Sequence, residues 1–215
     1  MAANGGDSGT SKITTLSINA TGKLDLNNND LIVDNGNLAA TTLLLKTGLD
    51  ITGSYGNGPG ITSSTFAGNP NQNTVLGIAP NSELGYTSFS GQTVDANDLL
   101  VKYTYFGDAD LNGVVDGATD FDLYITGLTS GGNSGGWLYG DFDYNGVVDS
   151  ATDFDLYITG LTTQSGALLT SGGGSSVTAV PEPSTLVLAG LGVLGFAGFN
   201  LRPRRVLAHK EAAAM

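Results

Sequence analysis

An acidic segment of 23 residues occurs twice in this chain and constrains its fold more than any other feature. Residues 107–129 and 140–162 match at 20 of 23 positions, with an offset of 33 residues. The copies differ only at three pairs of positions, namely Ala109 and Phe142, Leu111 and Tyr144, and Gly117 and Ser150. Because each repeat forms one unit of local structure, we expect two copies of the same unit that pack together.

The aspartates of the repeat have no basic neighbours in the sequence. The chain has 20 Asp and Glu against 8 Lys and Arg, a net charge of −12, and ten of the aspartates lie between residues 107 and 161. No Lys or Arg occurs from residue 103 to residue 201. Nucleic acid is therefore excluded as a partner, because phosphate binding needs a basic face. A cation is the expected ligand, and the alternative is a solvated acidic face.

The spacing of the acidic residues favours calcium. Loop 1, residues 108–120, reads DADLNGVVDGATD, and loop 2, residues 141–153, reads DFDYNGVVDSATD. Oxygen donors at positions 1, 3 and 5 surround a hard cation, glycine at position 6 permits a sharp turn, and position 7 donates its backbone carbonyl. The sequence therefore predicts one calcium ion in each loop.

Each loop leads into a segment with helical periodicity. Apolar residues recur at i, i+3, i+4 and i+7 and form one stripe in each copy. We expect the two stripes to bury each other, and Gly127 and Gly160 to end the helices. The stripes consist of Phe121, Tyr124, Ile125 and Leu128 in the first copy and of Phe154, Tyr157, Ile158 and Leu161 in the second.

A calcium loop followed by a single helix, duplicated within residues 107–162, resembles a type I dockerin module. The resemblance implies a cohesin-like partner, and it implies that carbonyl oxygens at position 7 join the side chains as calcium ligands. The implied ligands are Asp108, Asp110, Asn112, Val114, Asp116 and Asp120 in loop 1, and Asp141, Asp143, Asn145, Val147, Asp149 and Asp153 in loop 2.

One position departs from the dockerin pattern. The family has its chelating aspartate at position 12, where this chain has Thr119 and Thr152, with Asp120 and Asp153 one residue later. Either the loop bulges to bring these aspartates inward, or they cap the helices and the site is weaker. The segment also fits a capping box, in which Thr119 pairs with Asp122 and Thr152 with Asp155.

The region before the repeat is interpreted as a mainly β domain. Short groups of apolar residues between residues 12 and 35 alternate with polar residues and Asn/Gly turns. This pattern is typical of a short-strand meander or the end of a β-solenoid. We expect one short helix over residues 38–47, closed by Gly48, and loop over residues 52–73. Further strands are expected at residues 74–79, 86–89 and 99–106. In the last of these, Lys102 and Thr104 should face away from Val101, Tyr103 and Tyr105.

The C-terminal region has the order of a sorting signal. Pro181, Glu182 and Pro183 precede an apolar run, and three arginines follow it. A helix over residues 186–201 would span roughly 24 Å, less than the ~30 Å core of a bilayer. This order resembles the PEP-CTERM sorting signal of Gram-negative bacteria. The resemblance implies cleavage by an exosortase near Pro-Glu-Pro and display at the cell surface or outside it. The alternative is an ordinary C-terminal membrane anchor.

The expected organisation has six parts. These are a disordered N-terminus (1–11), the β-rich domain (12–106), the dockerin-like loop pair (107–162), a Gly/Ser linker (163–180), the sorting signal with its single apolar transmembrane helix (181–205) and a tail (206–215). Phrases within residues 24–33, 58–64 and 91–95 resemble the C-terminal regions of planctomycete-type surface proteins that carry autotransporter-associated β-strand repeats. Because residues 1–11 contain no leader, we expect the chain to continue upstream.

The residue types argue against catalysis. His209 is the single histidine and follows the sorting signal, so a Ser-His-Asp triad has no base. Carboxylate pairs occur mainly within the two loops, and Trp137 is expected to pack over the helix pair. We therefore expect a non-catalytic, calcium-binding surface protein of structural or adhesive role, with a surface polysaccharide as a further candidate partner. The alternative is the non-catalytic end of a larger secreted carbohydrate-active enzyme or of a cohesin-binding protein.

Overall fold

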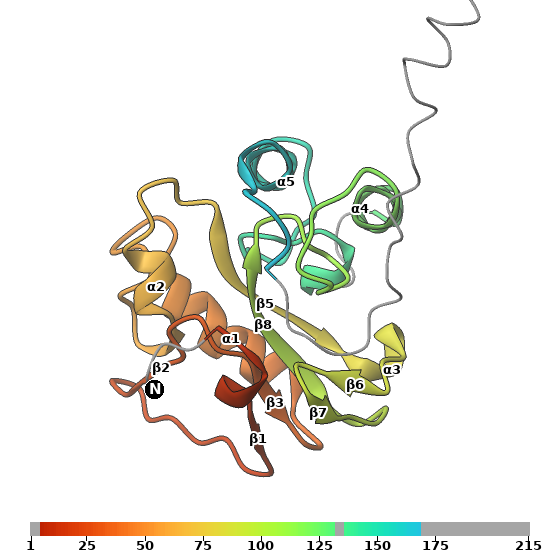
Figure 1. Cartoon of the computed structure of the whole chain (residues 1–215). Coiled ribbons are helices and arrows are strands. Elements are labelled where there is room, and N and C mark those ends of the chain that lie inside the picture. Colours follow the sequence, from red (N-terminus) through yellow and green to blue (C-terminus); the bar gives the residue numbers. More distant parts are fainter. Residues whose placement is uncertain (1–4, 132–135, 169–215) are drawn as a thin grey trace, which may run out of the picture. The chain divides into compact units, whose positions relative to one another are not determined.

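A four-stranded sheet with the order β1-β3-β8-β5 forms the framework of the computed structural model, which describes residues 5–131 and 136–168 (Figure 1). Its strands are β1 (Ser11–Ile13), β3 (Leu31–Val33), β5 (Thr74–Pro80) and β8 (Leu99–Tyr105). Two small sheets join β2 (Lys23–Asp25) to β4 (Gly60–Thr62) and β6 (Ser88–Phe89) to β7 (Gln92–Thr93). The helices are α1 (Leu38–Leu49), α2 (Ser64–Ala67), α3 (Asn81–Leu84), α4 (Thr119–Thr129) and α5 (Thr152–Thr163), with 3₁₀ turns η1 (Asp7–Gly9) and η2 (Gly136–Tyr139).

Alternate strands of the N-terminal region pair in parallel. β1 pairs with β3, and β2 pairs with β4, whereas β8 is antiparallel to both of its neighbours. Neighbouring strands of a meander pair antiparallel, so the meander prediction is wrong for residues 11–62. A β-solenoid also pairs its strands in parallel, so that alternative stays a prediction. The region is sheet-rich with a few short helices, as the sequence predicts.

Strand β8 is buried on both faces. Lys102 and Thr104, predicted to face away from Val101, Tyr103 and Tyr105, are both 0% exposed. The Lys102 ammonium lies 3.6 Å from a carboxylate oxygen of Asp30 and 5.5 Å from the ring centre of Phe89. Thr104 donates its hydroxyl hydrogen to Asp108 at the start of loop 1. The alternation of apolar and polar residues fails as an exposure signal here because these polar side chains find buried partners.

Helix α1 extends past the predicted end at Gly48. It begins after Asn37, whose side chain accepts a hydrogen bond from the Ala40 amide, and ends at Asp50, which has a left-handed backbone with a φ of 43°. Gly48 is a packing residue, because a Cβ there would lie 1.8 Å from the carbonyl oxygen of Ile61 on β4. The segment expected to be loop, residues 52–73, contains β4 and α2. The strand expected at residues 86–89 is reduced to the two residues of β6.

The predicted β-rich domain, residues 12–106, is not a separate compact unit in the structure. Residues 1–174 form one compact unit, and the described part of the predicted disordered N-terminus contains η1 and the start of β1. Helix α5 runs into the predicted linker, where Leu168 donates its amide hydrogen to the carbonyl of Gly113. Within the described ranges, no helix has the length and apolar character needed to span a membrane. The run 186–201 lies outside those ranges.

The contact between α1 and β4 gives a direct stability prediction. Gly48→Ala places a methyl group against a backbone carbonyl that cannot rotate away, so we expect a loss of at least about 2 kcal/mol in the free energy of unfolding, despite the better helix propensity of alanine. Thermal unfolding measures the effect, at roughly 2–4 °C per kcal/mol. Gly117→Ala, where a Cβ meets nothing within 4 Å, is the control and should be neutral. Equal melting temperatures for the two variants would contradict this packing.

Candidate metal centre

Each acidic loop gathers three carboxylates at one point. Asp108, Asp110 and Asp120 each contribute an oxygen to a cluster in loop 1 whose atoms lie within 4.8 Å of one another. Asp141, Asp143 and Asp153 form the corresponding cluster in loop 2. The first and last members of each cluster are buried. The arrangement presents hard oxygen donors to a common centre, which suits calcium or another hard cation.

The carboxylate at position 13 points into its loop, which is the first of the two arrangements considered for Asp120 and Asp153. Asp120, in the first turn of α4, accepts hydrogen bonds from the amides of Ala109 and Asp116, both at 2.8 Å. Asp153, in the first turn of α5, accepts the same bonds from Phe142 at 2.8 Å and Asp149 at 2.9 Å. The loop therefore wraps around this carboxylate, which ties its beginning to its end.

Position 9 has a capping role in this structure. One carboxylate oxygen of Asp116 accepts the amides of Ala118 at 2.8 Å and Thr119 at 2.7 Å. Asp149 does the same at the start of α5. Neither belongs to the three-carboxylate clusters. The predicted capping boxes do not form, because α4 and α5 begin after Ala118 and Ala151, which make no side-chain cap bond.

Positions 5 and 7 are linked within each loop. The side-chain oxygen of Asn112 accepts the Val114 amide at 2.8 Å, and its amide group donates to Asp110 at 3.0 Å. Asn145 makes the equivalent bonds to Val147 at 2.7 Å and Asp143 at 2.9 Å. These bonds hold Asn112 and Asn145 next to the clusters, at the rim of each loop.

Burial raises the pKa of the clustered carboxyl groups. The pKa of Asp141 rises to about 6 and that of Asp153 to about 7, in each case mainly because burial disfavours the charged form. Burial and the neighbouring carboxylates also raise the pKa values of Asp108 and Asp120 well above the usual range. A bound cation would remove this penalty by compensating the negative charges.

One carboxylate oxygen in loop 2 is left without a partner. Asp141 is 4% exposed, and no hydrogen-bond donor among the described residues reaches its Oδ1 atom. A buried carboxylate oxygen without a partner costs free energy comparable to a lost hydrogen bond to a charged group. The cluster of loop 2 thus contains an unsatisfied acceptor where a cation would be bound.

The two helices connect the loops to each other. The Tyr124 hydroxyl of α4 donates to the Asp149 carbonyl of loop 2 at 3.1 Å, and the Tyr157 hydroxyl of α5 donates to the Asp116 carbonyl of loop 1 at 3.0 Å. The two tyrosine rings stack at 6.3 Å with an interplanar angle of 8°. Each helix is therefore fixed by the loop of the other copy.

The sequence predicts that Gly127 and Gly160 end the helices, and this prediction is wrong. In the structure they allow neighbouring backbone to approach the helices closely. A Cβ at Gly127 would lie 1.9 Å from the Tyr139 carbonyl oxygen, and one at Gly160 would lie 1.7 Å from that of Phe106. Both helices continue for at least two further residues. Their glycines are buried because the chain segment that leads into the other loop crosses over them.

The sequence did not reveal how the loops attach to the sheet. Trp137 is 1% exposed and donates its indole hydrogen to the Asp108 carbonyl at 2.7 Å, so it lies beneath loop 1. Tyr86 donates to the Asp110 carbonyl at 2.8 Å, and Tyr144 of loop 2 donates to the Leu76 carbonyl of β5 at 2.6 Å. The periodicity of apolar residues and the spacing of aspartates within the repeat give no information on these contacts with distant segments.

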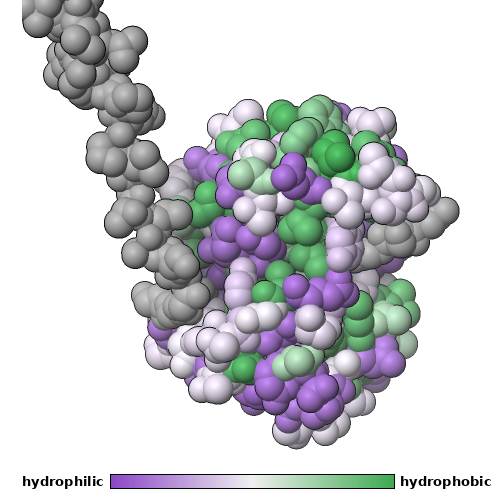
Figure 2. Space-filling model, turned by 90° about the vertical axis from the view of Figure 1, so that its right-hand side faces the viewer, coloured by the Kyte–Doolittle hydropathy of each residue, from purple (hydrophilic) through white to green (hydrophobic). Residues whose placement is uncertain are grey.

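The surface offers a further feature at the end that carries α4 and α5. Figure 2 shows hydrophobic residues among hydrophilic ones at the upper end of the molecule, where these helices lie in Figure 1. Val147 of loop 2 and Ile158 of α5 are exposed, at 44% and 36%. These two side chains are available for contact with another molecule.

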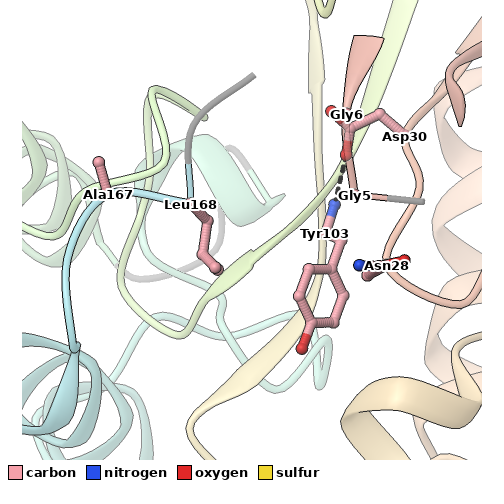
Figure 3. Close-up of a pocket in the computed structure, with 7 residues that line it drawn as sticks. All are labelled: Gly5, Gly6, Asn28, Asp30, Tyr103, Ala167 and Leu168. Carbon is pink, nitrogen blue, oxygen red and sulfur yellow. Dashed lines mark hydrogen bonds between the residues drawn. The ribbon is translucent and has the colours of Figure 1, made fainter. Parts of the chain in front are cut away.

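A cavity lies between the N-terminal segment and the end of the described chain (Figure 3), and Leu168, which lines it, donates its amide hydrogen to Gly113 of loop 1. Its volume is about 300 Å³, and it is lined by Gly5, Gly6, Asn28, Asp30, Tyr103, Ala167 and Leu168. One Asp30 oxygen accepts the Tyr103 amide at 2.9 Å, and the other accepts the Ser90 hydroxyl. The Tyr103 hydroxyl bonds to Thr74 at 3.1 Å. Its polar groups are engaged in the fold, so the cavity is a weaker candidate than the loops.

Comparison with known proteins concerns the C-terminal segment. Residues 179–205 match the model of the PEP-CTERM protein-sorting motif, as the sequence predicts. This motif is the recognition signal of an exosortase and implies sorting to the envelope or surface of a Gram-negative bacterium. The motif residues Pro181, Glu182 and Pro183 lie outside the described residues. None of the curated proteins and none of the solved structures matches the chain.

The raised carboxyl pKa values predict an unusual pH dependence. Without calcium, protonated clusters favour the folded state, so stability present near pH 4 is lost as the pH rises through the folded-state pKa values, which are about 7 for Asp153 and about 8 for Asp120. We therefore expect the melting temperature in EDTA to fall between pH 5 and pH 8. The variant Asp108→Asn with Asp141→Asn should show a shallower fall. A metal-free melting temperature that rises over this interval would contradict the assignment.

Proposed function

We propose that the described region is a non-catalytic calcium-binding module of a cell-surface protein, in which two ions hold the loop–helix pair and the sheet in one fold. The observation that supports this proposal most strongly is the pair of buried three-carboxylate clusters, one of which contains an oxygen without a hydrogen-bond partner. A structural cluster without an ion would have to keep three mutually repelling carboxylates desolvated. A divalent cation offsets that cost.

The donor set fits calcium better than a softer metal. All clustered side chains are carboxylates, and asparagine oxygens and backbone carbonyls lie in the same loops. Calcium accepts six to eight oxygen ligands in flexible geometry, so water can complete the shell where position 9 caps a helix. The proposed ligands are the six clustered aspartates, joined by the oxygens of Asn112 and Asn145 and the carbonyls of Val114 and Val147. Asp116 and Asp149 act through water.

The sorting motif and the loops fit one location. Extracellular calcium-binding modules work with dissociation constants of about 10⁻⁴–10⁻³ M, because calcium is abundant outside the cell. In this proposal the exosortase removes the tail after the run 186–201 has held the chain in the membrane. The calcium-loaded module then serves a structural or adhesive role on the envelope. Bound calcium also reduces the negative charge of the two loops, and it therefore weakens their repulsion from an anionic cell surface.

A second candidate function is docking to a cohesin-like protein. In a related form of this candidate, the chain is the non-catalytic end of a larger secreted carbohydrate-active enzyme. The duplicated loop–helix pair and the exposed Val147 and Ile158 favour a protein-binding role for this end of the unit. A surface polysaccharide is the other partner considered. Calcium has the same part in both candidates, because it fixes the loops that begin α4 and α5.

The position-13 aspartates provide the sharpest test of calcium binding. Asp120→Asn with Asp153→Asn removes one charge from each cluster, so we expect calcium affinity to fall at least tenfold. Asp122→Asn with Asp155→Asn removes the same charge from exposed positions two residues further along the same helices and should change affinity less than threefold. Isothermal titration calorimetry with calcium, together with melting temperatures at about 10 mM calcium, measures both.

Two outcomes would count against the calcium proposal. Wild-type protein that gives neither binding heat nor a rise in melting temperature with calcium would exclude it. Equal losses in the two aspartate pairs would mean that calcium responds to net charge and not to the clusters.

The sorting motif gives an independent prediction. In a host that makes an exosortase, and with a signal peptide placed before the chain, the mature product should end near Pro183 and appear in the surface fraction or medium. Replacement of Glu182 and Pro183 by alanine should leave uncleaved protein in the inner membrane. Mass spectrometry of the C-terminal peptide distinguishes the forms. An intact C-terminus through Arg205 on the surface would indicate a simple membrane anchor.

A further inference from the structure

The two loops share their candidate ligands but differ in what lies behind the first of them. Position 1 is Asp108 in loop 1 and Asp141 in loop 2, and both are buried. The repeat offset of 33 residues relates Thr104 before loop 1 to Trp137 before loop 2, and Lys102 to Gly135. The residues that precede the repeat therefore place different chemistry beside two otherwise matched sites.

In loop 1, protein donors occupy most of the Asp108 carboxylate. Its Oδ2 atom accepts the Thr104 hydroxyl and the Gly113 amide, the latter at 2.9 Å, and its Oδ1 atom shares the Asn112 amide with Asp110, at 3.0 Å from each oxygen. A carboxylate has about four acceptor positions, so three of them are already filled. A cation bound here competes for the negative charge that these donors share.

In loop 2, the equivalent carboxylate is largely unoccupied. Asp141 accepts one well-formed bond through Oδ2, from the Gly146 amide at 3.1 Å, the Asn145 amide and the Asp143 side chain interact with it more weakly, and its Oδ1 atom is buried with no well-formed hydrogen bond among the described residues. The Asn145 amide, which corresponds to Asn112, donates to Asp143 at 2.8 Å. Cation binding in loop 2 satisfies an acceptor that the metal-free protein leaves unsatisfied.

A buried positive charge adds to the difference. Lys102 on β8 is 0% exposed, and its side chain reaches loop 1, where a Cβ at Gly113 would lie 3.4 Å from the Cε atom of Lys102. Its ammonium is paired with Asp30 at 3.6 Å, which offsets part of this charge. A fixed ammonium in a buried region still repels a divalent ion nearby more strongly than it would in water.

One contact favours loop 1 instead. The Gln164 side chain accepts the Val115 amide at 2.9 Å and donates to the Val115 carbonyl at 2.7 Å, so it holds position 8 of loop 1 in place. This reduces the ordering required for binding. However, position 8 supplies no proposed ligand. Thr104 bonds directly to the ligand Asp108, and the charge of Lys102 acts on the electrostatic potential at this ligand. We therefore expect the latter effects to be larger.

We propose that the two calcium sites are unequal, with loop 2 as the tighter site and with Lys102 and Thr104 as the residues that weaken loop 1. This inference rests on the proposed calcium function. It assigns loop 2 to calcium retention at low concentration and loop 1 to a response at higher concentration. Because Lys102 and Thr104 lie on the strand that crosses the sheet, occupation of loop 1 is linked to the sheet itself.

Single-loop variants of the full chain test the inequality. Asp110→Ala leaves loop 2 as the intact site, and Asp143→Ala leaves loop 1. We expect calorimetric titration with calcium to give a dissociation constant at least tenfold lower for Asp110→Ala than for Asp143→Ala. In the Asp143→Ala background, Lys102→Met and Thr104→Val should each tighten binding about threefold or more. Lys12→Met, at a lysine paired with Asp98, and Thr104→Ser, which keeps the hydroxyl, are the controls.

The outcomes separate this inference from the calcium proposal. Absence of binding in wild-type protein would overturn the proposed function and this inference with it. Wild-type binding with equal constants in the two single-loop variants, or tighter binding in loop 1, would overturn the inequality alone. If Lys102→Met unfolds because Asp30 loses its partner, Thr104→Val against Thr104→Ser still decides whether β8 weakens loop 1. Unchanged affinity in Thr104→Val would remove that residue from the account.

Discussion

The desolvation of clustered carboxylates is the constraint on which the rest of this structure depends. Each loop brings three aspartates within 4.8 Å, and each cluster holds a position-13 aspartate by amides from the opposite end of its loop. Those amides close the loop, fix the first turn of the following helix and remove the carboxylate from water. Burial in the closed loop raises the pKa values of Asp120 and Asp153 more than the amide hydrogen bonds lower them. A cation that binds the cluster stabilises the loop, the helix start and the charge together.

The clusters are linked to the whole unit by reciprocal contacts. Tyr124 and Tyr157 each join a helix to the loop of the other copy, and buried glycines let the crossing segments pass close to the helices. Loop 1 also meets the sheet through Thr104 and the Trp137 indole. A change in one loop therefore reaches the other loop through a helix and reaches β8 directly, which is why residues 1–174 form one compact unit.

The sequence predicted the local chemistry better than the long-range packing. The repeat, its oxygen spacing and its helical stripe are local, and the structure brings three of the predicted aspartates together in each loop. The burial of Lys102 was missed because its partner, Asp30, lies 72 residues away in the sequence and leaves no local signal. Glycine at positions 48, 127 and 160 predicts helix ends, but close approach to a distant backbone carbonyl requires the same residue, so the sequence does not distinguish the two roles. The sequence leaves parallel and antiparallel pairing of the first strands open, since short strands do not specify their partners, and β1 pairs with β3 in parallel.

A crystal structure of the chain grown with calcium, with anomalous data collected at long wavelength, tests the central claim most directly. The account predicts two anomalous peaks, one in each loop. Each peak should lie about 2.3–2.6 Å from oxygens of the three clustered aspartates, with Asp120 and Asp153 among the ligands. Clusters that remain free of calcium at millimolar concentration, with Asp141 Oδ1 bonded to water alone, would contradict it.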